Sequence, residues 1–271
     1  MWPVFVMGTL AMCTTQPLHK AFARANRLAV LMARPVESLE AFEQKELQGL
    51  LRQDTYDESK FSTEHAAFKA AHNAVFVQLA QHCGGLGGNL FYLDGPNGRT
   101  TQSLLAVGME RSQLYTANWY PTTCASLMAP PHSLPECNVA ASRAGKALSD
   151  DFRRTSFKAV FLDGCGGAVE PLTECIEVLF KTERTLPSSF AIGFTLTDAE
   201  PTGRPLADRE ADVHRAIASA CRAADYRFLH VWDEPHLFGV DARTSKRDAG
   251  TLTSWHVCTR PHVALGEWSG G

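Results

Sequence analysis

Apolar positions in the first third of the chain recur near the 3.6-residue period of an amphipathic helix. The pattern predicts helices over residues 21–33 and 37–52 and a third helix capped by Ser62 or Thr63. A glycine-rich run then ends the helical pattern. We therefore expect residues 1–88 to form a helical N-terminal extension or lid.

From residue 89 the pattern changes to short apolar runs that alternate with helical segments. This alternation is typical of an α/β fold, in which helices cover both faces of a parallel sheet. The last two runs are joined without a helical pattern, so these two strands are expected to pair antiparallel. The predicted strands cover residues 90–93, 113–117, 138–141, 157–162, 190–196, 226–232 and 251–258.

The amino-acid composition agrees with a folded protein and excludes two other classes, disordered chains and proteins that bind nucleic acid by bulk charge alone. The 271 residues are 45% hydrophobic and 20% charged, which excludes wholesale disorder. Lys and Arg number 26 against 29 Asp and Glu, a net charge of -3, so binding of nucleic acid by bulk charge alone is not expected.

No metal site is expected. The eight cysteines include no C-x-x-C pair, and reduced, mostly buried thiols are the simpler interpretation. His65 and His72 are seven residues apart on the third helix, without i, i+4 spacing or an apparent third ligand. They are either structural histidines or contacts of a lid or substrate. The side of the helix that carries them also includes Phe68, Lys69, Asn73 and Phe76.

The N-terminal residues leave two localisations open. The apolar run from Trp2 to Cys13 is too short to cross a membrane, which takes roughly 20 residues. Residues 1–36 contain Lys and Arg but no Asp or Glu, as in an organelle transit peptide. We expect a cytoplasmic protein, with organelle import as the alternative.

The turn after the first strand carries the main functional signal. It consists of Asp94, Gly95, Pro96, Asn97 and Gly98. Residues 89–258 resemble the class I S-adenosylmethionine-dependent methyltransferases, whose motif I has an acidic residue followed by a Gly-x-Gly-x-Gly loop. Pro96 stands where the first glycine of that loop would fall, so motif I is degenerate. The resemblance implies a Rossmann-like, doubly wound sheet in the order 3-2-1-4-5-7-6 with strand 7 antiparallel. It also implies S-adenosylmethionine as cofactor.

The resemblance places the cofactor at the carboxyl ends of the strands. Asn118, twenty-four residues after Asp94, can hydrogen-bond a ribose hydroxyl but carries no charge. Trp119 and Tyr120, which follow, would stack on the adenine or pack at the surface. The cofactor-binding residues implied are Asp94, Gly95, Asn97, Gly98, Asn118, Trp119, Ser142 and Asp163.

Asp163 follows the fourth strand, at a position that resembles motif IV. The resemblance implies that Asp163, Thr195 and Thr197 lie nearest the transferred methyl group and that Asp163 aligns the acceptor or takes its proton. Alternatively, Asp163 caps the following turn. Cys165 would be the nucleophile of a pyrimidine methylase, but the Pro-Cys pair usual there is missing, and packing in the turn is expected instead.

The expected function is methyl transfer from S-adenosylmethionine to an unidentified acceptor, with a small molecule or protein favoured over RNA because of the charge balance. A non-catalytic Rossmann-like binding protein with weak or lost cofactor affinity is the alternative. An NAD-dependent oxidoreductase is disfavoured by the absence of a complete G-x-G-x-x-G motif.

Overall fold

A computed structural model of the chain describes residues 63–84, 87–163, 168–181, 184–198, 203–240, 247–248 and 250–261. The chain divides into two compact units, Met1–Arg52 and Gln53–Gly271. Everything described belongs to the second unit. The helices predicted over residues 21–33 and 37–52 lie outside the described residues.

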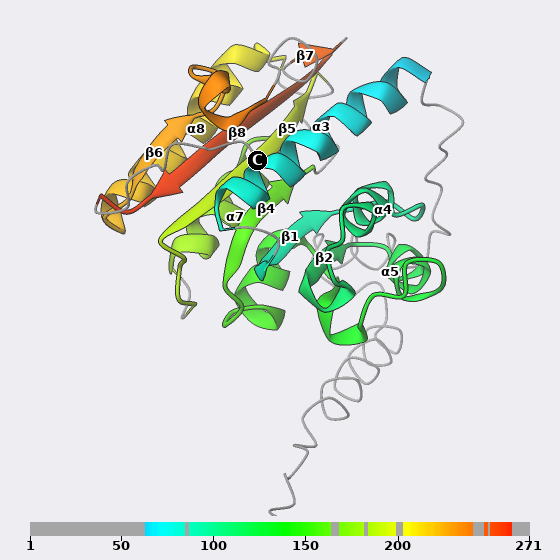
Figure 1. Ribbon diagram of the computed structural model, residues 1–271. Helices are drawn as coiled ribbons and strands as arrows, with labels where there is room; N and C mark the ends of the chain where they lie inside the picture. Colours follow the sequence, from blue (N-terminus) through cyan, green and yellow to red (C-terminus); the bar gives the residue numbers. More distant parts are fainter. Residues whose placement is uncertain are drawn as a thin grey trace, which may run out of the picture. The chain divides into compact units, whose positions relative to one another are not determined.

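One mixed sheet organises the described part (Figure 1), in the order β3-β2-β1-β4-β5-β8-β6, with the short β7 paired to β8. Its strands are β1 (Asn89–Leu93), β2 (Leu114–Asn118), β3 (Val139–Ala141), β4 (Phe157–Leu162), β5 (Ser189–Thr197), β6 (Arg227–His230), β7 (Arg247–Asp248) and β8 (Thr251–Thr259). The strands β1 to β5 pair in parallel, whereas β8 is antiparallel to both β5 and β6. Since β8 is the predicted seventh strand, the predicted order 3-2-1-4-5-7-6 is confirmed, and β7 is an addition to it.

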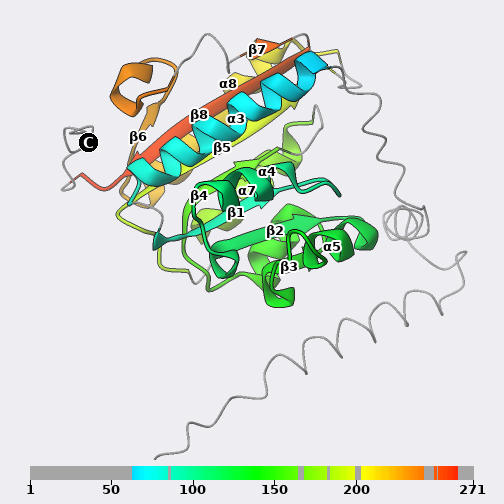
Figure 2. The same ribbon diagram turned by 45° about the vertical axis from the view of Figure 1, so that its right-hand side comes forward.

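Helices cover both faces of this sheet (Figure 2). They are α3 (Thr63–His82), α4 (Arg99–Ala106), α5 (Pro121–Met128), α6 (Ala144–Lys146), α7 (Glu170–Lys181) and α8 (Leu206–Ala223), with the short helices η4 (Arg111–Gln113), η5 (Glu136–Asn138), η6 (Ala147–Asp151) and η7 (Pro235–Phe238). Within these described ranges, no helix combines the length and apolarity that a bilayer crossing needs.

Alternate residues of each strand enter two separate hydrophobic clusters. In β1, Phe91 packs with residues of α7 and α8, whereas Leu90 and Tyr92 pack with residues of α3, α4 and α5. Burial on both faces is what parallel strands between two helical layers require, and it explains their nearly continuous apolar runs.

The helix α3 lies along the sheet over β5 and β8 (Figures 1 and 2). The Phe76 ring stacks on Trp255 of β8 with 5.8 Å between the ring centroids, and Trp255 also packs on Phe161 of β4 at 4.6 Å. Gly193 of β5 makes room for this indole, because a Cβ atom there would lie 2.0 Å from Trp255 Cζ3. The helix is thus one of the layers of the sheet unit, and the lid role expected of residues 1–88 stays a prediction.

Candidate functional site at the carboxyl edge of the sheet

The parallel strands β1, β4 and β5 are neighbours, so their carboxyl ends lie side by side at one edge of the sheet. In open α/β sheets this edge is where ligands bind. The candidate residues from the sequence all follow or end one of the strands that reach this edge, or the neighbouring β2 and β3.

The Asp94 carboxylate holds the turn between β1 and α4. Its Oδ2 accepts hydrogen bonds from the amide and the hydroxyl of Thr101, both at 2.8 Å, and its Oδ1 accepts from the amides of Gly95 at 3.0 Å and Thr100 at 3.4 Å. Burial raises the pKa of the Asp94 carboxyl above its ordinary value, against the hydrogen bonds from Thr101 and Thr100. The Asp94 carboxylate therefore satisfies two amides of the first turn of α4, those of Thr100 and Thr101.

Gly98 is required by the packing of its own turn. Its φ of +57° and ψ of 40° are left-handed, and a Cβ atom there would lie 2.5 Å from Cε1 of the His132 ring. The His132 Nδ1 is buried and has no hydrogen-bond partner among the described residues. Asn97 is exposed, and its carbonyl accepts a 2.8 Å hydrogen bond from Gln102 Nε2. Close approach of His132 thus requires a glycine here, and the cofactor-binding role expected of Gly98 stays a prediction.

The side-chain amide of Asn118 joins the ends of β1 and β2. Its Nδ2 donates to the Asp94 carbonyl at 2.8 Å, and its Oδ1 accepts from the Tyr120 amide at 2.8 Å. Both ends of the amide thus have partners within the chain.

Trp119 and Ser142 both contact Arg143, which follows β3 at the same edge. The Arg143 guanidinium lies over the Trp119 ring, with Cζ 4.3 Å from the ring centroid, a cation–π contact. The Ser142 hydroxyl donates to the Arg143 carbonyl at 3.4 Å. The aromatic face expected to receive the adenine therefore carries Arg143 in this structure.

Asp163, at the end of β4, pairs with a lysine of α3. The Lys69 Nζ lies 2.5 Å from Asp163 Oδ2, and the Thr195 hydroxyl donates to Oδ1 at 2.7 Å. The exposed fraction of the Asp163 side chain is 7% and that of Lys69 is 22%, so the pair is largely removed from solvent. Burial alone would raise the pKa of the Asp163 carboxyl, but the charge and hydrogen bond of Lys69, with the Thr195 hydroxyl, hold it below its ordinary value. The carboxylate is ionised at neutral pH.

Thr197 lies two residues beyond Thr195 on β5, and so on the same face of the strand. Its hydroxyl is buried and has no hydrogen-bond partner in the part of the chain that the structure describes. Its carbonyl accepts a 2.8 Å hydrogen bond from Arg209 Nη1. The structure thus brings Asp163 and Thr195 into contact, while the proposed catalytic roles stay predictions. Cys165 lies outside the described residues.

The helix α3 also places polar side chains at this edge. From the sequence, these were expected to be either structural residues or contacts of a lid or substrate. Besides Lys69, His72 Nε2 lies 2.7 Å from the Thr253 hydroxyl of β8, and Asn73 Oδ1 accepts from the Thr100 hydroxyl at 3.2 Å. The spacing of Lys69, His72 and Asn73 on one side of the helix was the available signal. The side chain of His65 lies outside the described part.

The strand order completes the geometric argument. An antiparallel β8 between β5 and β6, after the order 3-2-1-4-5, is the arrangement implied by the resemblance. The chain has the Rossmann-like fold of the class I methyltransferases. No protein-family model and no curated protein matches the sequence.

Solved structures similar to this chain have low sequence identity to it. The sugar N-methyltransferase KedS8 from Streptoalloteichus has a TM-score of 0.44 at 13% identity, covering 77% of this chain and 97% of that one. The plantazolicin methyltransferase BamL has 0.40 at 8%, covering 89% and 98%. The spermidine synthase of Thermotoga maritima has 0.40 at 9%, covering 75% of this chain and 62% of that one. Structures with such low identity and TM-scores do not indicate the activity of this chain, which has to be inferred from its own residues.

Proposed function

We propose that this protein transfers a methyl group from S-adenosylmethionine to a small-molecule or protein acceptor. The observation that carries the proposal is the position of the ionised Asp163 beside the carboxyl end of β1, in a sheet with the methyltransferase strand order. When bound, the cofactor supplies a methyl group already activated on a sulfonium. The protein's task is then to orient the acceptor.

The residues proposed to hold the cofactor fit it in part. Gly95, Asn97 and Ser142 are at least partly exposed at the edge. Thr197, one of the residues predicted to be catalytic, has a buried hydroxyl that lacks a partner among the described residues. At the adenosine end, Trp119 would receive the adenine once Arg143 leaves its face or moves to the other side of the base. Asp94, Gly98 and Asn118 shape the turn and the strand ends rather than offering free side-chain groups.

Asp163 is proposed to align an amine or hydroxyl acceptor by accepting a hydrogen bond from it. A carboxylate whose pKa is held low is a weak base at neutral pH, so alignment suits it better than removal of a proton. Lys69 keeps the carboxylate charged, and Thr195 orients its Oδ1. Lys69 and Thr195 are therefore positioning residues in this proposal.

A second function is favoured by Asn118 and Arg143. The Asn118 amide is bound at both ends within the chain, and Arg143 covers Trp119, as in a Rossmann-like protein that has lost cofactor affinity. Calorimetry of the full chain with S-adenosylmethionine and with S-adenosylhomocysteine separates the two functions. Heat of binding from either compound supports the enzyme, and none from both supports the non-catalytic protein.

Variants of neighbouring aromatic residues test where such a compound binds. Trp119→Ala should weaken binding of S-adenosylhomocysteine by about fivefold or more, since aromatic contacts contribute on the order of 1 kcal/mol. Tyr120→Ala is the matched control, because Tyr120 is exposed beside it and should leave the affinity unchanged. Equal losses in the two variants would contradict the adenine site.

Asp163→Asn tests the catalytic step. Turnover per folded molecule should fall by at least roughly tenfold while affinity for S-adenosylhomocysteine is retained, because Asp163 is proposed to contact the acceptor. Slow hydrolysis of the cofactor or methyl transfer from a labelled donor to lysate fractions provides the assay. Unchanged turnover together with lower stability would instead make Asp163 a structural residue.

A further inference from the structure

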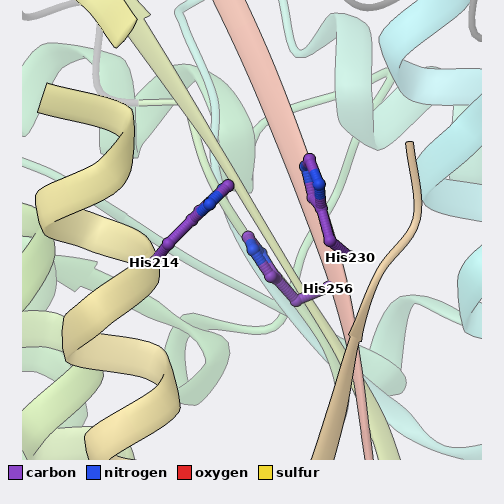
Figure 3. Close-up of side chains that lie close together, drawn as sticks. All are labelled: His214, His230 and His256. Carbon is purple, nitrogen blue, oxygen red and sulfur yellow. The ribbon is translucent and has the colours of Figure 1, made fainter. Parts of the chain in front are cut away.

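Three histidines that are far apart in the sequence come together on the other face of the sheet (Figure 3). They are His214 of α8, His230 of β6 and His256 of β8, and their candidate ligand nitrogens all lie within 4.8 Å of one another. The ring centroids are 4.6 Å apart for His214 and His230, 4.6 Å for His214 and His256, and 5.1 Å for His230 and His256. This cluster lies under α8, whereas the Lys69–Asp163 pair lies under α3.

The most deeply buried residue of the cluster is His256, and its ring lacks hydrogen-bond partners among the described residues. His256 is fully buried, and neither of its ring nitrogens has a hydrogen-bond partner in the described ranges. A fully buried polar group with no partner is costly unless a ligand satisfies it.

A carboxyl group lies near two of these three rings. Glu210 of α8 places its Oε1 3.6 Å from His214 Nε2 and 3.9 Å from His230 Nε2. This oxygen is buried and makes no hydrogen bond to any described residue. Zinc sites in proteins have ligand distances of about 2.0–2.2 Å for histidine nitrogen and carboxylate oxygen, which corresponds to about 3.3 Å between ligand atoms in a tetrahedron.

Neighbouring polar groups orient the rings for such a role. His230 Nδ1 lies 3.2 Å from the Asp233 carboxylate, a contact that orients the ring with Nε2 toward the cluster. The Ser254 hydroxyl lies 3.0 Å from both His214 Nε2 and His230 Nε2, so the two rings already point at one place. Three imidazoles and one carboxylate are the ligand chemistry of a first-row transition ion such as zinc.

We propose that His214, His230, His256 and Glu210 form a zinc site that fastens α8 to β6 and β8. All four available ligand positions come from the protein, as in a structural zinc site. The proposal is independent of methyl transfer.

The test uses the purified full chain, stripped of metal with a chelator and titrated with Zn²⁺ and with Co²⁺. We expect one ion per chain and the intense visible absorption of four-coordinate Co²⁺, without a thiolate-to-cobalt charge-transfer band. The last condition matters because the Cys221 and Cys258 sulfurs lie 3.5 Å apart between α8 and β8. A thiolate band, or the lack of one-to-one binding, would overturn the proposal.

Variants locate the ion. His256→Ala would leave a cavity at a fully buried position and is at risk of misfolding. The decisive variant is therefore His230→Gln, because the His230 side chain is 13% exposed. His230→Gln should lower zinc affinity by about 100-fold or more. Loss of a residue that only hydrogen-bonds a ligand already lowers metal affinity by about 10- to 100-fold, and loss of a ligand should cost at least as much. Glu210→Gln should weaken binding as well. His82→Gln, on α3 over the opposite face of the sheet, is the matched control and should bind as the wild type does. Equal affinity in His230→Gln and His82→Gln would overturn the site.

Discussion

The two faces of the sheet at β5 and β8 satisfy their buried polar groups in different ways. On the α3 face, Lys69 pairs with Asp163, and His72 contacts the Thr253 hydroxyl. On the α8 face, His256, three residues along β8 from Thr253, has no hydrogen-bond partner among the described residues. The two sides of β8 therefore face two different polar environments.

This difference separates a buried charge whose partner lies within the protein from a buried ring that has no hydrogen-bond partner among the described residues. A buried charge is stable only when it is paired, and the α3 face supplies both partners from the protein. The α8 face instead gathers three imidazoles and the Glu210 carboxyl group, and the zinc ion proposed above would join them. The comparison predicts that changes on the α3 face alter folding, whereas changes in the histidine cluster alter metal binding.

The largest expected effect is that of Lys69→Met. It leaves the buried Asp163 carboxylate without its cation, which should lower the free energy of unfolding by about 3–5 kcal/mol. Denaturant titration measures the loss. The double variant Lys69→Met/Asp163→Leu should recover most of it, because an apolar pair replaces the ion pair. A double variant as unstable as Lys69→Met would contradict this account of the pair.

Gly193→Ala tests the packing beneath α3. The added Cβ would lie 2.0 Å from the fully buried Trp255 ring, so the indole has to move, and the free energy of unfolding should fall by about 1–3 kcal/mol. Thermal unfolding and near-ultraviolet circular dichroism of the tryptophans would report the change. The control is Gly87→Ala, where an added Cβ would have no neighbour within 4 Å. Similar losses in both variants would remove the role assigned to Gly193.

Arg143→Ala tests the contact over Trp119. We expect a loss of about 0.5–1 kcal/mol in the free energy of unfolding, as for a partly exposed cation–π contact. If the adenine binds on this ring, the same variant should bind S-adenosylhomocysteine at least as tightly as the wild type. Weaker binding would mean that Arg143 itself contacts the ligand.

The two buried aspartates should respond to pH with opposite signs. The pKa of Asp163 is lowered by Lys69 in the folded state, so its contribution to stability is present above the unfolded pKa near 4 and is lost as the pH falls through the folded value. The pKa of Asp94 is raised by burial, so its contribution is present below pH of about 4 and is lost as the pH rises through the folded value.

Unfolding measured across these pH ranges checks the sign. The stability difference between wild type and Asp163→Asn should shrink as the pH falls below about 4, whereas the difference between wild type and Asp94→Asn should shrink as the pH rises above about 4. Slopes of the same sign in both series would show that one of the two environments is wrongly described.

The alternation of apolar runs and helical segments was enough to predict the sheet. The run Phe157–Leu162 was predicted with the bounds that the structure has, and β5 differs by one residue at each end. The segment Ala144–Asp151, which holds α6 and η6, was missed because it is short and contributes only a few buried residues. Long, strongly apolar runs carry their own signal, whereas short helices depend on what they pack against.

The sequence predicted which candidate residues lie at the ends of neighbouring strands, but not which partners their side chains have. The proximity of Asp163 and Thr195 follows from the neighbouring strands β4 and β5, and the predicted order therefore placed both at one edge. The partners of Asn118 and the cover over Trp119 depend on side-chain orientation and on a residue of another strand end, Arg143. Periodicity carries no information on either.

The sequence by itself determined the strands, the order that the family resemblance implied, and the residues that could reach the carboxyl edge. Only the tertiary structure decided that Lys69 would neutralise Asp163 and that three histidines would meet. The histidines stand 16 and 26 residues apart in the chain, on one helix and two strands, and no local spacing relates them. Their contact follows from the antiparallel register that sets His230 opposite His256, and from the packing of α8 over that pair. Both are long-range interactions that form only when the whole sheet assembles.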